Sequence, residues 1–401
     1  MVVYFLIAPF TYHPDTKLVL YYPILNDGKV WDIYTYLDRN KDDAPKFHYP
    51  PMHFWVLKAE LPLVKLIGGN KIVDWLKIGG NIAFKDDRIY LYNLATKFPL
   101  IILVLLSGFL IFKTLVKNGL TEKVAKRATM IWFFNPITLY SAIIMGQNDI
   151  LAIFPFLLGL YFYYDLPILA FVLFGMGGSI KNYPLIWAIM LALVYPKKKF
   201  IDKIGLVLIP IFFYVATIFP FLKFEYFKND VMLSGLSTRI FDSFLDIGMG
   251  DKLLIVPTLL VSLAMIGIKN KLSRNIYLLN SLLATSTLLI LGFTHFHPQW
   301  FIWMMPFVSV LLAISAEWWW FVVMLPALSG IILLFNDKYL YWGLFSPINS
   351  NLVNLPYINE MLTSRGIDGV LLNNLCHSII AGVAVYWFIV CCANKKVFNK
   401  K

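Results

Sequence analysis

Two histidines two residues apart form the first candidate site for chemistry in this sequence. They are His295 and His297 in the stretch THFHPQW, directly before a long apolar run. Imidazoles bind metals, and they also form hydrogen bonds with phosphate oxygens. A metal needs three or four ligands, and the remaining histidines form no spaced ligand pair: His13, His48, His53 and His377. We therefore expect no metal site, and phosphate binding and capping of the next helix both stay open.

The stretch MGQNDILA places three hydrogen-bonding side chains between two apolar runs. They are Gln147, Asn148 and Asp149. An Asn or Asp at the start of a helix caps its free N–H groups, which explains one of these residues better than it explains all three. Binding of a polar ligand is therefore the second interpretation.

A lysine stands where glycine and proline interrupt another apolar run. Lys181 lies in GGSIKNYP, between Gly178 and Pro184. A lysine at a membrane boundary often extends its ammonium group to the interface. A break between helices also points backbone N–H groups at bound anions, to which a lysine adds a compact charge. We expect Lys181 to bind an anion, with simple placement at the interface as the alternative.

Carboxylates and one arginine complete the candidates. In WDIYTYLD, Asp32 and Tyr36 are four residues apart and share one helical face. A carboxylate near a membrane surface can act as a general base toward a hydroxyl, although a solvated acidic loop, with Asp27 nearby, is the simpler interpretation. Arg239, in LSGLSTRIFDSF, is equally suited to pairing with Asp242 on a local turn and to contacting an anionic ligand.

The composition indicates the class of fold that positions these side chains. The chain has 401 residues, of which 59% are hydrophobic and 14% are charged, whereas about a quarter of the residues in soluble proteins are charged. Apolar runs of roughly 17 to 25 residues recur along the chain, each long enough to cross a hydrocarbon core about 30 Å thick. These runs are too long and too uniform for barrel strands. We therefore predict an all-α integral membrane protein.

The apolar runs predict about 10 to 12 membrane segments. We place them at residues 2–12, 90–112, 124–144, 149–164, 167–181, 183–196, 204–222, 252–268, 275–293, 299–316, 318–335 and 369–391. Segments rich in lysine and arginine mark the cytoplasmic side, and four of them stand out: 113–127, 197–203, 269–274 and the C-terminal tail. Both termini are then cytoplasmic in a multi-pass plasma membrane protein.

All four basic segments reach the cytoplasm only if residues 167–196 enter the membrane and return. Gly177, Gly178 and Pro184 break that stretch into two short helices, so we predict a helical hairpin with Lys181 near its outer tip. The remaining connections then lie outside: 13–89, 145–149, 223–251, 294–298 and 336–368. The candidate residues therefore collect on one extracytoplasmic face.

The first outer segment contains helices of its own. After the Tyr-Pro-Pro at residues 49–51, apolar residues follow the i, i+3, i+7 and i+10 spacing of one helical stripe: Phe54, Leu57, Leu61 and Val64. We predict an amphipathic helix that lies in the membrane interface and is kinked at Pro62. A second short helix is expected from Lys71 to Ile78.

At these residues the chain resembles the GT-C superfamily of integral membrane glycosyltransferases. It is most similar to the polyprenol-phosphate-mannose-dependent branches, which make phosphatidylinositol mannosides and GPI anchors. Five segments carry the resemblance in order: DIYTY (32–36), HYPP (48–51), NPITLYSAIIMGQNDILA (135–152), SIKNYPLI (179–186) and HPQWFIWMMP (297–306). They are similar to the family's Asp-x-x-x-Tyr, Tyr-Pro-Pro, Asn-Pro with Gly-Gln-x-Asp, Lys-x-x-Pro and Gln-aromatic-x-x-Trp motifs. The similarity runs from about residue 25 to residue 310.

The resemblance implies a GT-C type bundle of helices with interfacial helices in the first outer loop. The whole chain, 1–401, would be one membrane domain, with the first outer loop at 13–89, core spans at 90–316 and C-terminal spans at 317–401. Its activity would be that of an inverting glycosyltransferase, which moves a sugar from a polyprenyl-phosphate donor to a lipid- or glycan-linked hydroxyl. That the transferred sugar is mannose rests on the resemblance alone. No cofactor, metal or nucleic acid is expected, and the partners are the two substrates and membrane lipids.

The resemblance also implies roles for single residues. Asp32 is expected to deprotonate the acceptor hydroxyl, with Asp27 as the alternative because the distance from Asp32 to Tyr-Pro-Pro is short. The departing phosphate is expected to be stabilised by fixed donors: Lys181, His297 and His295. The sugar or acceptor would be oriented by Gln147, Asn148 and Asp149. The other expected substrate-binding residues are Tyr36, Tyr49 and Arg239.

Two other classes of membrane protein share these features. A lipid-linked sugar transporter or flippase also carries charges at membrane depth, but transporters often show repeated halves with paired broken helices, and this chain has one obvious break and no repeat. A polymerase or ligase of the O-antigen type depends on arginine-rich outer loops. After residue 130 the arginines are Arg239, Arg274 and Arg365, and Arg274 is expected in the cytoplasm. Both classes stay as alternatives.

Overall fold

The structure, a computed structural model, describes residues 2–40, 46–80, 82–196, 199–315 and 317–393. Over these ranges it is almost entirely helical. Four helices are long and apolar enough to cross a membrane: α6 (Ile89–Lys117), α12 (Phe200–Ile218), α15 (Ile276–Phe293) and α19 (Gly369–Ala393). Shorter apolar helices accompany them: α9 (Ile150–Phe162), α10 (Pro167–Ile180), α11 (Tyr183–Val194), α14 (Ile255–Lys269), α16 (Met305–Ser315) and α17 (Trp319–Leu334). This helical architecture is consistent with the predicted membrane protein, and membrane insertion and the number of spans stay predictions.

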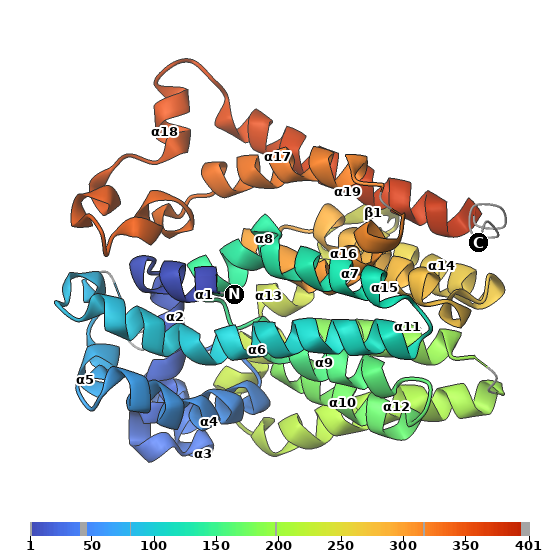
Figure 1. The fold of residues 1–401 in the computed structure, drawn as a ribbon, viewed down its shortest axis with the longest axis horizontal. Helices are drawn as coiled ribbons and strands as arrows, with labels where there is room; N and C mark the ends of the chain where they lie inside the picture. Colours follow the sequence, from blue (N-terminus) through green and yellow to red (C-terminus); the bar gives the residue numbers. More distant parts are fainter. Residues whose placement is uncertain (1, 41–45, 81, 197–198, 316, 394–401) are drawn as a thin grey trace.

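The long helices run side by side along the long axis of the molecule (Figure 1). α10 packs between α9 and α12, α6 joins this group through α9, and α19 packs on both α15 and α17. α7 (Glu122–Phe134) links α6 to α16. The most apolar stretch of α15 is 78% buried, whereas those of α12 and α19 are 22% and 28% buried. α15 is therefore central, and α12 and α19 lie at the periphery with apolar faces suited to lipid.

The break between α10 and α11 lies where the sequence predicts it. α10 ends at Ile180, Lys181 has extended backbone angles (φ −144°, ψ 143°), and α11 begins at Tyr183. Gly177 lets α10 approach α9 closely, since a Cβ at that position would lie 2.9 Å from the carbonyl oxygen of Ala152. This close packing brings the break next to the start of α9.

In its described residues, the first outer segment forms four α-helices before α6 begins: α2 (Pro14–Tyr21), α3 (Val30–Arg39), α4 (Pro51–Gly68) and α5 (Ile72–Lys77). The sequence predicts α4 and α5, and α4 contains Pro62 and buries the expected stripe: Phe54, Leu57, Leu61 and Val64. α2 and α3 are additional to that prediction. α1 (Val2–Ile7) ends earlier than the expected boundary at residue 12 and is followed by a 3₁₀ turn.

The predicted span 124–144 bends at Asn135. α7 ends at Phe134 because Pro136 has no N–H and disfavours helical angles in the residue before it. The Asn135 side chain then accepts a hydrogen bond from the Thr138 N–H at 2.7 Å and caps the short α8 (Pro136–Thr138). A π-helical turn (Leu139–Ile144) follows and leads to Gly146, whose φ of 69° favours glycine. The turn after Gly146 presents residues 147–149.

The chain between α12 and α14 departs from the helical bundle. It contains a π-helical turn (Phe227–Met232), α13 (Gly235–Thr238) and an antiparallel hairpin of β1 (Phe244–Gly248) and β2 (Asp251–Leu254). The three residues of the hairpin turn, 248–250, all have positive φ. Between α17 and α19 the chain forms 3₁₀ turns and α18 (Ile358–Thr363), a segment that reaches away from the bundle (Figure 1).

Candidate functional site

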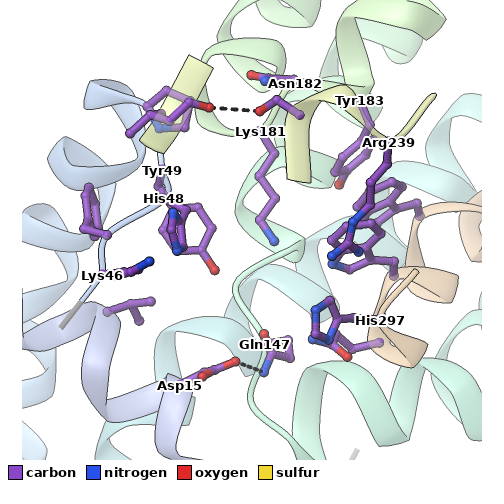
Figure 2. A pocket seen from close by; sticks show the side chains of 18 of the residues that line it. Asp15, Lys46, His48, Tyr49, Gln147, Lys181, Asn182, Tyr183, Arg239 and His297 are labelled. Atoms are coloured by element: carbon purple, nitrogen blue, oxygen red, sulfur yellow. Dashed lines mark hydrogen bonds between the residues drawn. The ribbon is translucent and has the colours of Figure 1, made fainter. Parts of the chain in front are cut away.

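Segments far apart in the sequence enclose a cavity of about 620 Å³. They are α2, residues 46–50, the turn at 147, the α10–α11 break, residues 231–240 and residues 290–303. Figure 2 shows polar side chains from these segments directed into the space between them. The polar lining includes Asp15, Lys46, His48, Tyr49, Gln147, Lys181, Asn182, Arg239, His297 and Gln299. Four of the five segments that we expected on the outer face thus contribute to this cavity, and residues 336–368 do not line it.

Lys181 lines the cavity, and its ammonium group is held by a buried aspartate, Asp149. Its Nζ donates to Asp149 Oδ1 at 2.7 Å, and the Trp303 indole N–H donates to the same oxygen at 2.6 Å. Asp149 is fully buried and does not line the cavity. Its role is therefore that of a counter-ion that holds Lys181, and direct contact with a sugar, expected from the sequence, is not supported by its position.

Stacked aromatic rings hold the second cation, Arg239. Tyr183 stacks on Trp303 with ring centroids 3.8 Å apart, and Trp303 stacks on Trp300 at 4.9 Å. The Arg239 guanidinium lies over Trp300 at 5.3 Å and donates to the His295 carbonyl oxygen at 3.2 Å. A guanidinium on an indole face is attracted by the ring quadrupole. Lys181 and Arg239, two of the three cations that line the cavity, thus both lie against neighbouring aromatic rings.

A second stack supports Lys181 from the side of α4. The rings of Tyr49 and His53 are parallel and 4.0 Å apart, and Lys181 Nζ lies 5.3 Å from the centre of the Tyr49 ring. His53 is fully buried and its Nδ1 lies 3.3 Å from the Ile180 carbonyl oxygen. Burial, reinforced by the charge of Lys181, lowers the pKa of His53 to about 3. His53 is therefore neutral and packs as an aromatic ring.

Among the described residues, Asp15 is the carboxylate that lines the cavity, and local sequence patterns do not single it out. It stands in the first turn of α2, where the positive end of the helix dipole favours an anion. Its Oδ2 accepts a hydrogen bond from the Gln147 side-chain amide at 3.3 Å and lies 3.6 Å from His13 Nδ1. The signal available in the sequence was YHPDT: an aspartate directly after the first apolar run, with proline at the first helical position.

Hydrogen bonds from α2 and α6 hold the turn that carries Gln147. Thr16 Oγ1 donates to the Met145 carbonyl oxygen at 2.8 Å, and the buried Lys97 Nζ donates to that of Ile144 at 2.8 Å. A Cβ at Gly146 would lie 2.8 Å from Thr16 Oγ1. Since Thr16 directly follows Asp15 in the chain, these hydrogen bonds fix the side-chain amide of Gln147 beside the Asp15 carboxylate.

The expected base, Asp32, lies outside the cavity. α3 buries Val30, Ile33, Tyr34 and Leu37 as one stripe. Asp32 and Tyr36 occupy the other side of this helix, and neither lines the cavity. The alternative, Asp27, has a side chain outside the part of the chain that the structure describes.

The two histidines of THFHPQW lie in different environments. His297 lines the cavity and is half-buried, and burial together with Arg239 lowers its pKa to about 4 against the opposing effect of Asp15. His295 is exposed and stacks on Phe335 with centroids 5.7 Å apart. In the described ranges no group of three or more His, Cys, Asp or Glu side chains is placed to hold a metal ion. Of these two histidines, His297 is thus the one available to a ligand in the cavity.

The expected substrate-binding residues divide into two groups. Those that line the cavity are Tyr49, Gln147, Lys181, Arg239 and His297. Those that do not are Tyr36, Asn148, Asp149 and His295. Residues that line it without having been selected are chiefly Asp15, Lys46, His48, Gln299, Trp300 and Trp303. The last three lie in the expected motif HPQWFIWMMP, so the motif located them although single roles could not be read from it.

The chain was compared with protein-family models, with curated proteins and with solved structures. None of these comparisons gives a match. Function is therefore inferred from the residues of the cavity.

Proposed function

We propose that the protein is an inverting glycosyltransferase. It moves a sugar, with mannose as the first candidate, from a polyprenyl-phosphate donor to a hydroxyl of a lipid- or glycan-linked acceptor. The observation that carries the proposal is one cavity lined both by a carboxylate, Asp15, and by two held cations, Lys181 and Arg239. A carboxylate suits removal of a proton from a hydroxyl, and fixed cations suit a phosphate leaving group.

In the proposed reaction Asp15 is the general base. The acceptor oxygen attacks C1 of the donor sugar while Asp15 takes the hydroxyl proton. The bond from C1 to the phosphate oxygen breaks, and its electron pair stays on the departing polyprenyl phosphate. Attack from the face opposite the leaving group inverts the anomeric centre. Asp15 takes this role in place of Asp32 because Asp15 lines the cavity and is held by Gln147.

The departing phosphate would be stabilised by donors that are already fixed. Lys181 is held by Asp149 and lies near Tyr49, and Arg239 is held by Trp300. Donors fixed before the reaction stabilise developing charge without reorganising during it. His297, neutral at physiological pH because of its lowered pKa, supplies a further hydrogen bond.

The proposed location of the reaction is the extracytoplasmic face of the plasma membrane. The basic segments 113–127, 197–203 and 269–274 mark the cytoplasmic side, with both termini there. Apolar side chains also line the cavity, among them Leu185, Ile186 and Ile290. They offer an apolar wall to the isoprenoid chain of a lipid-linked donor.

The test is sugar transfer by the purified protein in lipid nanodiscs. The assay supplies polyprenyl-phosphate-mannose and a panel of lipid- and glycan-linked acceptors. We expect transfer that is lost in Asp15→Asn and retained in Asp32→Asn, a matched control on the neighbouring helix. Loss in Asp32→Asn with retention in Asp15→Asn would return the base to Asp32. Donor binding without transfer to any acceptor would contradict the proposal and favour a transporter.

A further inference from the structure

The β1–β2 hairpin carries large apolar side chains on both of its faces. Successive side chains of a strand point to opposite sides. The register pairs Leu245 with Leu253 on one face and Asp246 with Lys252 on the other. Phe244 and Leu254 also pair, on the same face as Asp246 and Lys252. The face of the two leucines is therefore the one without this charged pair.

Its apolar side chains are exposed. The exposed fraction is 56% for Leu245, 65% for Ile247 and 42% for Leu253, and Met249 at the turn is fully exposed. Such a concentration of large apolar side chains on one small element marks an interaction surface. Exposure of these side chains to water alone would therefore be unfavourable.

The helix that follows the hairpin, α14, indicates what surrounds the exposed apolar side chains. β2 ends at Leu254 and α14 begins at Ile255, so no linker separates them. α14 has 15 residues, about 22 Å at 1.5 Å per residue, which is shorter than a hydrocarbon core of about 30 Å. It exposes apolar side chains of its own, including Val261 and Met265. The apolar surface of the hairpin thus continues that of a helix too short to cross the bilayer alone.

We propose that the hairpin inserts the face of Leu245 and Leu253 among the lipid acyl chains of the leaflet next to the cavity. Its depth is limited, because the open edges of a two-stranded hairpin need water or head groups for their backbone N–H and C=O groups. Asp246 and Lys252 then face the head groups. A second copy of the chain is a poorer occupant, since stable interfaces bury about 800 Å² on each partner, far more than four side chains supply.

The contact has a direct connection to the site. The hairpin follows the turn Arg239–Phe241 after two residues, and Arg239 and Ile240 line the cavity. Membrane contact at the hairpin would therefore fix the segment that carries Arg239. This inference concerns the lipid surface and does not depend on the reaction proposed above.

Site-directed spin labelling tests the proposal. Cys376, Cys391 and Cys392 are first replaced by serine, and single cysteines are introduced as Leu245→Cys, Met249→Cys and, on the exposed outer turn, Asn351→Cys. The labelled proteins are reconstituted in phosphatidylcholine vesicles. We expect the ratio of oxygen to nickel-chelate collisions to be several-fold higher at 245 and 249 than at 351. Equal ratios at all three sites would put the hairpin in water and overturn the proposal. Low collision rates with both reagents at 245 would mean coverage by protein, which also overturns it.

A second measurement needs no substitution and covers variants that fail to fold. The unmodified protein is photolabelled in vesicles that contain phosphatidylcholine with a diazirine in its acyl chain, and modified peptides are mapped by mass spectrometry. We expect adducts on residues 244–254 as well as on α14. Adducts on α14 with none on 244–254 would contradict the insertion of the hairpin.

Discussion

Lys181 and Asp149 form an ion pair of 2.7 Å in which only the lysine reaches the cavity. The aspartate is fully buried and shares its Oδ1 with the indole N–H of Trp303. A buried charge is tolerated when it is paired and hydrogen-bonded, and loss of one partner leaves the other charge uncompensated. The stability of the fold and the position of the cation therefore depend on the same contact.

The first prediction separates these two effects. Lys181→Met should lower the free energy of unfolding by about 3 to 5 kcal/mol, because it leaves Asp149 buried without its cation. The double variant Lys181→Met with Asp149→Leu should recover part of that loss and none of the donor binding. Thermal unfolding in detergent micelles and binding of polyprenyl phosphate measure the two quantities. A double variant no more stable than Lys181→Met would mean that the pair is not the source of the loss.

The second prediction concerns the base. Gln147→Glu places a carboxylate where an amide now donates to Asp15 at 3.3 Å. A like charge disfavours the ionised form of a neighbouring carboxylate, and a general base must be ionised, so the acid limb of the kcat/KM–pH profile should move to higher pH. Gln147→Leu, which removes the donor without adding a charge, serves as the control and should lower the rate with a smaller shift of the limb. An unchanged acid limb in Gln147→Glu would argue against Asp15 as the base.

The third prediction is a pH dependence of stability. The folded-state pKa of His53 is about 3, below the ordinary value of 6.5, so the unfolded chain binds one more proton than the folded one between these values. Stability should therefore fall as the pH is lowered from about 6.5, by up to about 1.4 kcal/mol per pH unit for this one group. His53→Phe, which keeps the stack on Tyr49, should reduce that slope. Melting temperatures between pH 4.5 and 7.5 provide the measurement, and identical slopes in parent and variant would exclude His53 as a source.

The fourth prediction concerns Arg239. Trp300→Ala removes the ring on which the guanidinium lies, a contact of about 0.5 to 2 kcal/mol, and should weaken binding of polyprenyl phosphate by about 2- to 30-fold. Trp300→Phe should retain most of the affinity. In Arg239→Ala, the further change Trp300→Ala should have little effect, because the two residues act together. Additive effects of the two substitutions would show that Trp300 contacts the ligand independently.

Much of the fold was predictable because local patterns determine it. The stripe Phe54, Leu57, Leu61 and Val64 gave α4, and the glycines and proline around Lys181 gave the break between α10 and α11. The bend at Asn135 was predictable in principle from Pro136, yet uniform apolarity around it favoured a straight span. The hairpin 244–254 gave no strand signal strong enough to separate it from the apolar run that begins at residue 252.

Which aspartate lines the cavity was not predictable from local patterns. Asp15 and Asp32 both follow the first apolar run, and what distinguishes them is contact with a turn more than 100 residues later in the chain. Thr16 and Gln147 make that contact. Similarly, three consecutive polar residues gave no indication that Gln147 faces the cavity while Asp149 is buried against Trp303.

The chain of contacts from Arg239 through Trp300, Trp303 and Asp149 to Lys181 has an entropic consequence. A free lysine or arginine side chain loses about 2 kcal/mol of rotamer freedom when it is immobilised. Here that ordering occurs when the protein folds, since both cations have partners without any ligand. In the proposed reaction, an arriving phosphate therefore meets side chains with little freedom left to lose, so more of its interaction energy is available for affinity.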